Sequence, residues 1–99
     1  MRRAARVDAN HRLIVAALRT AGCSVLSLAA VGKGCPDILV ARAGINYLLE
    51  IKKKTARGAI SAGAARSLEG QEAWAERWRA PVHFVSTPEE ALDAVGLVA

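Results

Sequence analysis

The spacing of hydrophobic and polar positions predicts the elements of one α/β domain. Residues 8–21 carry apolar side chains at the helical period, and Gly22 follows as a stop. Further helices are expected over residues 68–79, with Ser67 as the N-cap, and after the start signal at residues 87–90. Apolar, β-rich runs predict four strands, over residues 24–28, 35–41, 45–52 and 81–86. The order of elements predicts a central mixed sheet flanked by helices.

A turn over residues 42–44 is predicted to join two of these strands into a hairpin. Side chains alternate along a strand, so residues of the second strand divide into two faces. Leu48, Glu50 and Lys52 point one way, whereas Tyr47, Leu49 and Ile51 point the other. An acid and a base therefore lie side by side at the end of an otherwise apolar strand.

Asp37 opens the neighbouring strand directly after Pro36, and Glu50 follows thirteen residues later. Two carboxylates from adjacent strands can hold a hard divalent cation, which prefers oxygen ligands. Lys52, one pleat beyond Glu50, can orient a water or stabilise charge developing on a phosphate. A Glu-x-Lys pair alone is common in surface hairpins, where Asp37 would serve the turn. The combination of this pair with Pro-Asp in apolar strands favours a functional site, because charged side chains are unusual in strands this apolar.

Charge and composition narrow the class of partner. The chain has 99 residues, a formal net charge of +5 and a pI of about 9.9, which favours nucleic acid ahead of an anionic membrane. Plain solubility is the alternative explanation of this charge. No apolar run reaches the roughly 18 residues of a membrane span, and no long apolar stretch follows the basic residues 1–6, so a cytoplasmic protein is expected. Cys23 and Cys35 indicate buried thiols.

Asp37, Glu50 and Lys52 fit the PD-(D/E)xK nuclease signature. Together with Gly34-x-Pro-Asp-Ile-Leu-Val, Leu-Glu-Ile-Lys and a later Gln71 on a helix, the pattern resembles the VRR-NUC family, most closely its small stand-alone phage and bacterial members. The resemblance runs over nearly the whole chain, with residues 7–99 as one nuclease domain behind a basic arm of residues 1–6. It implies a restriction-endonuclease-like αβββαβ core and an Mg²⁺- or Mn²⁺-dependent endonuclease that hydrolyses DNA phosphodiester bonds.

The same resemblance implies roles for individual residues. Asp37 and Glu50 would bind the metal, with the Ile51 carbonyl as an extra ligand, and Lys52 would position water or neutralise developing charge. Gln71 would orient Lys52 or a metal-bound water. Asp8 has two interpretations that the sequence leaves open. It is either the N-cap of the first helix or an acidic group beside the metal, where longer family members carry Glu.

Basic residues concentrate directly after the Glu-x-Lys element. This stretch, up to residue 66, contains no acid and predicts a loop that holds phosphate backbones without reading sequence, unless it is only a solvated charge run. The candidate nucleic-acid contacts are Lys33, Lys53, Lys54, Arg57 and Arg66.

The resemblance further implies a homodimer acting on branched or duplex DNA, such as four-way junctions, without a small-molecule cofactor. Trp74 and Trp78 are predicted to make core or dimer contacts rather than to stack on bases. Asn10 falls on an apolar helix face, so it is expected at the rim of the site or in a hydrogen bond to backbone. Two other functions stay open: a non-catalytic nucleic-acid-binding module on this fold, and a small dimeric structural protein.

Overall fold

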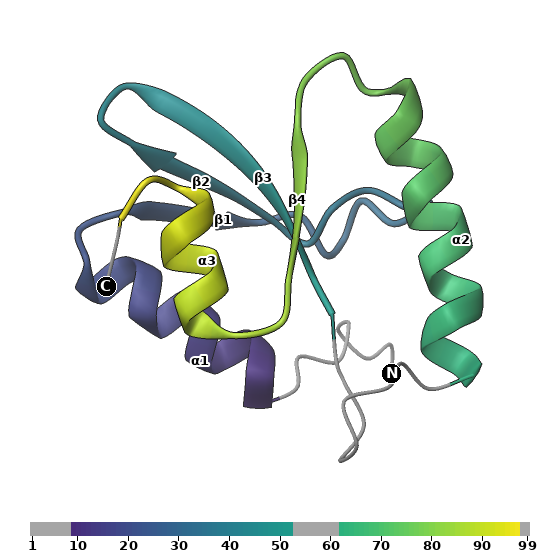
Figure 1. Ribbon diagram of the computed structural model, residues 1–99, viewed down its shortest axis with the longest axis horizontal. Coiled ribbons are helices and arrows are strands. Elements are labelled where there is room, and N and C mark those ends of the chain that lie inside the picture. Colours follow the sequence, from purple (N-terminus) through teal and green to yellow (C-terminus); the bar gives the residue numbers. More distant parts are fainter. Residues whose placement is uncertain (1–8, 53–61, 98–99) are drawn as a thin grey trace.

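The computed structural model describes residues 9–52 and 62–97, with side chains up to Lys52 and from Gly70 onward. Figure 1 shows three helices around one sheet. The elements are α1 (Ala9–Thr20), β1 (Ser24–Ser27), β2 (Ile38–Arg42), β3 (Ile45–Ile51), α2 (Ala62–Arg77), β4 (Val82–Val85) and α3 (Pro88–Ala94). The predicted order αβββαβ, with a further helix, is therefore confirmed.

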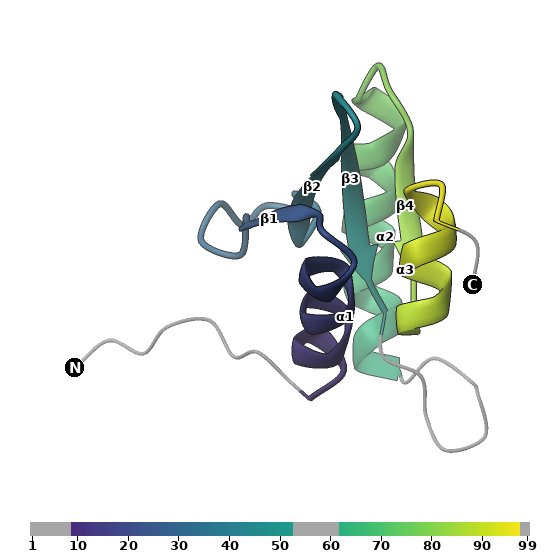
Figure 2. The same cartoon turned by 90° about the vertical axis from the view of Figure 1, so that its left-hand side faces the viewer.

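The four strands form one mixed sheet in the order β1-β2-β3-β4. The first three are antiparallel neighbours, and β4 returns through α2 to pair with β3 in parallel. In the turned view of Figure 2, β3 and β4 run side by side, with α2 behind them. This topology leaves β1 and β4 as the two edges of the sheet.

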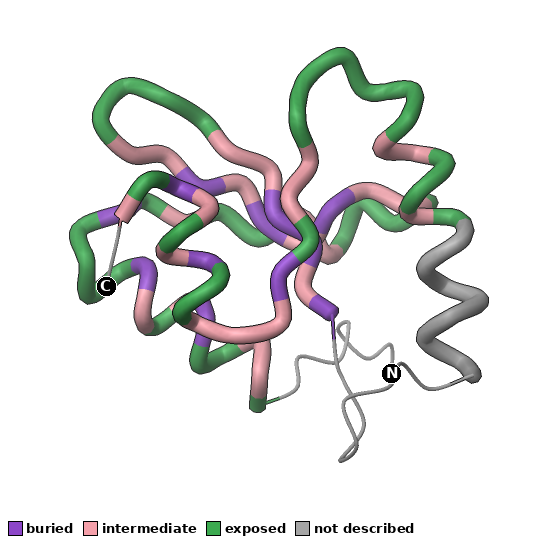
Figure 3. The backbone as a smooth tube through the Cα atoms, in the orientation of Figure 1, coloured by how far each residue is buried: buried purple, intermediate pink, exposed green. Residues whose placement is uncertain are grey.

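The hydrophobic core lies between the sheet and the pair α1 and α3. It contains Ile14, Leu18, Cys23, Ile38, Val40, Leu49, Val85, Ala91 and Val95. Figure 3 shows the buried residues gathered where the strands face these two helices, whereas the described side chains of α2 are half-buried or exposed. The predicted alternation in β3 is confirmed, because Leu49 enters the core and Tyr47 and Ile51 pack against it.

The hairpin turn is one residue shorter than the sequence predicts. Arg42 pairs with Ile45, so only Ala43 and Gly44 form the loop. Both loop residues have positive φ, 52° and 81°, which is the backbone of a two-residue turn matched to strand twist.

Helix α2 begins at Ala62, well before the predicted start at residue 68. The early start follows from alanines at positions 62, 64 and 65, since alanine has the highest helix propensity. Ser67 is consequently inside the helix and is not its N-cap. Arg66 lies on the helix rather than in the predicted loop, and its side chain is outside the described part of the structure.

The predicted start of α3 is confirmed in detail. The Thr87 hydroxyl accepts a hydrogen bond from the Glu90 N–H at 3.0 Å, and Pro88 occupies the first turn. The Glu90 carboxylate accepts from the Ser86 N–H at 2.6 Å. Both acceptors serve backbone N–H groups at the helix start, as in a capping box.

Candidate active site

The hairpin register brings Asp37 and Glu50 to opposite positions on neighbouring strands. Ile38 pairs with Leu49, so the preceding Asp37 lies across from Glu50. One oxygen of Asp37, Oδ2, accepts a hydrogen bond from the Ile51 N–H at 2.7 Å. This bond holds the half-buried Asp37 carboxylate beside β3, although Asp37 itself precedes β2.

Glu50 is the most deeply buried acid among the described residues, with 2% of its surface exposed. Its Oε1 atom is buried without a hydrogen-bond partner in that part of the chain. Burial, followed by the negative charge of Asp37, raises the pKa of Glu50 from 4.5 to about 8, against the opposing effect of Lys52. The site therefore holds a carboxyl group whose charged form is poorly stabilised by the protein alone.

Lys52 lies on the same face as Glu50, as the alternation predicts. Its Nζ atom is 3.6 Å from Glu50 Oε2 and 5.6 Å from the centre of the Phe84 ring. The same nitrogen donates a hydrogen bond to Gln71 Oε1 of α2. Three neighbours from β3, β4 and α2 thus restrict the position of one ammonium group.

The backbone of Lys52 is held as firmly as its side chain. Its N–H donates to the Val85 carbonyl at 2.7 Å, and its carbonyl accepts from Asn10 Nδ2 at 3.2 Å. The expectation that Asn10 bonds to backbone is therefore confirmed, and the bond connects α1 to the end of β3. Asp8, two residues earlier, lies outside the described residues, so its two interpretations stay open.

The loop before β2 closes the site toward α2. Gly34 has a φ of 83°, and a Cβ atom placed there would lie 2.9 Å from the Gly70 carbonyl oxygen and 3.3 Å from Trp74 Cβ. Glycine is therefore required by both the backbone conformation and the close approach. Gly34 therefore sets how closely this loop approaches α2 at Gly70, the residue before Gln71.

Sequence reasoning missed two neighbours of the site. Cys35 is half-buried, and burial together with the charges of Glu50 and Asp37 raises the pKa of its thiol. A signal was present, because Cys35 is two residues before Asp37 and so shares its side of an extended chain. Phe84 reaches Lys52 only through the β3–β4 pairing, where it lies opposite Glu50. That pairing joins distant parts of the chain and left no local signal.

The donor set fits a divalent cation in chemical type. Two carboxylates face each other, and Glu50 Oε1 is a buried oxygen without a partner among the described residues. No group of three or more His, Cys, Asp or Glu side chains arranged for metal binding occurs within residues 9–52 and 62–97. Asp37 and Glu50 would therefore be the acidic ligands in this part of the chain, with Ile51 contributing its N–H to orient Asp37.

The candidate phosphate-binding residues are not brought together by the described structure. Lys33 lies on the exposed loop before β2, with a positive φ of 57°. Lys53, Lys54 and Arg57 fall outside the described residues.

A scan of the chain against family models finds no match, and a search of curated proteins finds none either. Within the described part of the chain, no helix is long and apolar enough to cross a membrane.

Proposed function

We propose that this protein is a metal-dependent nuclease of the VRR-NUC type that hydrolyses DNA phosphodiester bonds. The observation that carries the proposal is the buried Glu50 carboxyl group, which faces Asp37 and lies 3.6 Å from Lys52. Two acids at opposite positions destabilise each other's charged forms, so this arrangement costs stability unless a cation joins it. Mg²⁺ or Mn²⁺ held there would polarise a phosphate and lower the pKa of a bound water.

The side chains around the acids have separate tasks in this proposal. Asp37, oriented by the Ile51 N–H, and Glu50 hold the cation against the ends of the strands. Lys52 supplies a positive charge to the phosphate as negative charge develops on it. Gln71 is a positioning residue, because it acts through its hydrogen bond to Lys52. The formal net charge of +5 favours the approach of a polyanion such as DNA.

A homodimer acting on branched DNA is the further part of this proposal. An apolar groove of about 710 Å³ lies between the sheet and α2, lined by residues that include Leu39, Leu48, Trp74 and Trp78. The two tryptophan rings stack with centroids 4.8 Å apart, yet Trp78 keeps 49% of its surface exposed. A second copy covering this groove would remove that apolar surface from water. Two sites related by a two-fold axis would suit paired cuts in a four-way junction.

We further propose that the protein works in the cytoplasm. Cys23 and Cys35 are both free thiols, and free thiols are typical of a reducing compartment.

Cleavage of labelled DNA tests the proposal. A four-way junction, a linear duplex and a single strand would be incubated with Mg²⁺, Mn²⁺ or EDTA. We expect metal-dependent cleavage that falls by at least about 100-fold in Glu50→Gln and Lys52→Ala. Glu76→Gln, which removes an exposed acid of α2, is the matched control and should cleave normally.

The alternative is a non-catalytic nucleic-acid-binding module. Binding without cleavage of any of the three substrates, in either metal, would refute the nuclease and leave this alternative. Absence of salt-dependent binding as well would leave a structural protein.

A further inference from the structure

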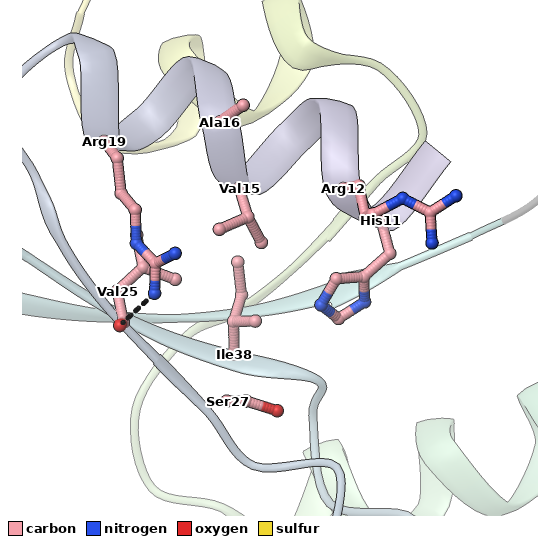
Figure 4. A pocket seen from close by; sticks show the side chains of 8 residues that line it. All are labelled: His11, Arg12, Val15, Ala16, Arg19, Val25, Ser27 and Ile38. Carbon is pink, nitrogen blue, oxygen red and sulfur yellow. Dashed lines mark hydrogen bonds between the residues drawn. The ribbon is translucent and has the colours of Figure 1, made fainter. Parts of the chain in front are cut away.

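A pocket with both polar and apolar lining residues lies on the other side of the sheet from the acids, between α1 and β1. Figure 4 shows it in close view, with Val15 and Ile38 facing each other across its centre. The cavity measures about 320 Å³ and is lined by His11, Arg12, Val15, Ala16, Arg19, Val25, Ser27 and Ile38. None of these residues belongs to the Asp37–Glu50–Lys52 group.

The described residues that line the pocket carry positive charge and include no acid. Arg12 and Arg19 supply this charge, and neither α1 nor β1 contains an Asp or Glu residue. The Arg19 guanidinium donates a hydrogen bond to the Val25 carbonyl at 3.3 Å, which holds it over the cavity (Figure 4). The Ser27 hydroxyl accepts from the Ala29 N–H at 3.3 Å, so its own proton can be donated to a ligand.

The spacing of the arginines favours an extended polyanion over a single phosphate ion. Arg12 and Arg19 are seven residues apart on α1, which corresponds to about 10 Å along the helix axis. A DNA strand advances about 3.4 Å per phosphate, so the two guanidinium groups match phosphates about three nucleotides apart. His11 lies beside Arg12, between the helix and the strands (Figure 4).

The pocket and the acidic pair lie on opposite faces of the sheet, at the same end of the strands. Ser27 pairs with Ile38 and Ile38 pairs with Leu49, the neighbour of Glu50. Two strand spacings across the sheet amount to about 10 Å. Ile38 and the acids face opposite sides of the sheet, so a nucleic-acid strand that occupies both sites would pass around this end of the sheet, and phosphates in the pocket would then flank the scissile bond.

We propose that this pocket binds the phosphodiester backbone of a nucleic acid. Its arginines contact phosphates about three nucleotides apart and Ser27 donates to the same backbone, and contacts of this kind position the chain without reading sequence. The statement that these phosphates flank the cleaved bond rests on the proposed nuclease function. Binding in the pocket does not depend on cleavage.

The test compares two double variants of the full-length protein, Arg12→Gln/Arg19→Gln and Arg77→Gln/Arg79→Gln. Both remove two positive charges, but Arg77 is the last residue of α2, Arg79 follows the helix, and both are exposed. Binding of a fluorescent 20-base-pair duplex would be measured by anisotropy in EDTA over a range of salt concentrations. We expect the pocket variant to raise Kd at least about 10-fold and to reduce the salt slope by about 2, with a much smaller change in the control.

NMR of the two histidines gives an independent readout of location. His11 lines the pocket, whereas His83 lies on β4 at the opposite edge of the sheet. The duplex should shift the His11 ring resonances and leave those of His83 in place. Inorganic phosphate and adenosine monophosphate, added at the same phosphate concentration, should shift neither.

Each outcome decides the matter. Equal weakening by the two double variants, or no duplex binding by the unaltered protein, would overturn the pocket proposal. Shifts of His11 by inorganic phosphate or the nucleotide alone would overturn it in favour of a small-anion site. Loss of binding confined to the pocket variant, together with no cleavage in Mg²⁺ or Mn²⁺, would support the pocket and refute the nuclease.

Discussion

Glu50 loses its proton as the pH rises, and this loss makes the metal-free protein less stable. The pKa of this group is about 8 in the folded protein, against 4.5 for the ordinary carboxyl group. Between these values the folded state binds a proton that the unfolded state releases, so the free energy of unfolding falls with increasing pH. The stabilising effect of protonation is complete below pH 4.5 and is lost above about pH 8.

The size of this effect follows from the same two values. The rise in the pKa of Glu50 from 4.5 to about 8 limits the loss in free energy of unfolding to about 5 kcal/mol. Ionisation of a buried acid draws in water and relaxes its surroundings, so we expect a smaller loss of roughly 2 kcal/mol between pH 5 and pH 9. Glu50→Gln keeps the size of the side chain and has no charge to lose. The variant should match the original protein at pH 5 and exceed its stability by roughly 2 kcal/mol at pH 9.

Urea unfolding in EDTA, followed by circular dichroism at pH values from 5 to 9, measures this difference. Subtracting the two curves removes the contributions that both proteins share and isolates Glu50. Added Mg²⁺ should restore stability at pH 9 in the original protein but not in Glu50→Gln, because binding to the folded state alone stabilises it. Parallel curves for the two proteins across this range would refute the reasoning.

Two further predictions concern the contact between α2 and the site. Gly34→Ala should lower the free energy of unfolding by about 2 kcal/mol, because its Cβ would lie 2.9 Å from the Gly70 carbonyl oxygen. Gly32 is the control: it has a similar φ of 68° but no neighbour within 4 Å, so Gly32→Ala should lower it by only about 1 kcal/mol. Thermal unfolding of both variants measures the difference. Equal losses would show that the close approach is unimportant. Gln71→Leu removes the acceptor of Lys52 and should lower kcat about 10-fold or more with little change in KM, whereas a change confined to KM would contradict a positioning role.

The pairing of Asp37 with Glu50 shows how far local sequence patterns reach. The period of a strand places Glu50 and Lys52 on one face whatever the pairing, and this was predicted correctly. The partner of Asp37 depends on turn length, however. A three-residue turn would have paired Ala41 with Ile45 and put Leu49 opposite Asp37, whereas the observed turn of Ala43 and Gly44 shifts the register by one residue. Ala-Gly lacks the Asn-Gly or Asp-Gly signal of a two-residue turn.

Contacts between distant segments were predicted less completely than contacts within the hairpin. The side of α2 that carries Gln71 was expected from helical spacing, and Gln71 does meet Lys52. The contact of Phe84 with Lys52 depends on the parallel pairing of β3 and β4, and the approach of Gly34 to α2 depends on the path of a loop. Neither arrangement repeats at a fixed spacing in the sequence, so periodicity carried no information about them.

The site joins a well-packed part of the fold to a less buried one. Ile38 and Leu49, the neighbours of the two acids, belong to the core under α1 and α3, and Asn10 holds the backbone of Lys52 from that side. Gln71 reaches the Lys52 side chain from α2, whose described side chains contribute nothing to this core. Local stability follows buried apolar contacts, so α2 should open at lower free energy than the sheet. Changes at the α2 contact should therefore disturb the position of the Lys52 ammonium before they unfold the strands that carry Asp37 and Glu50.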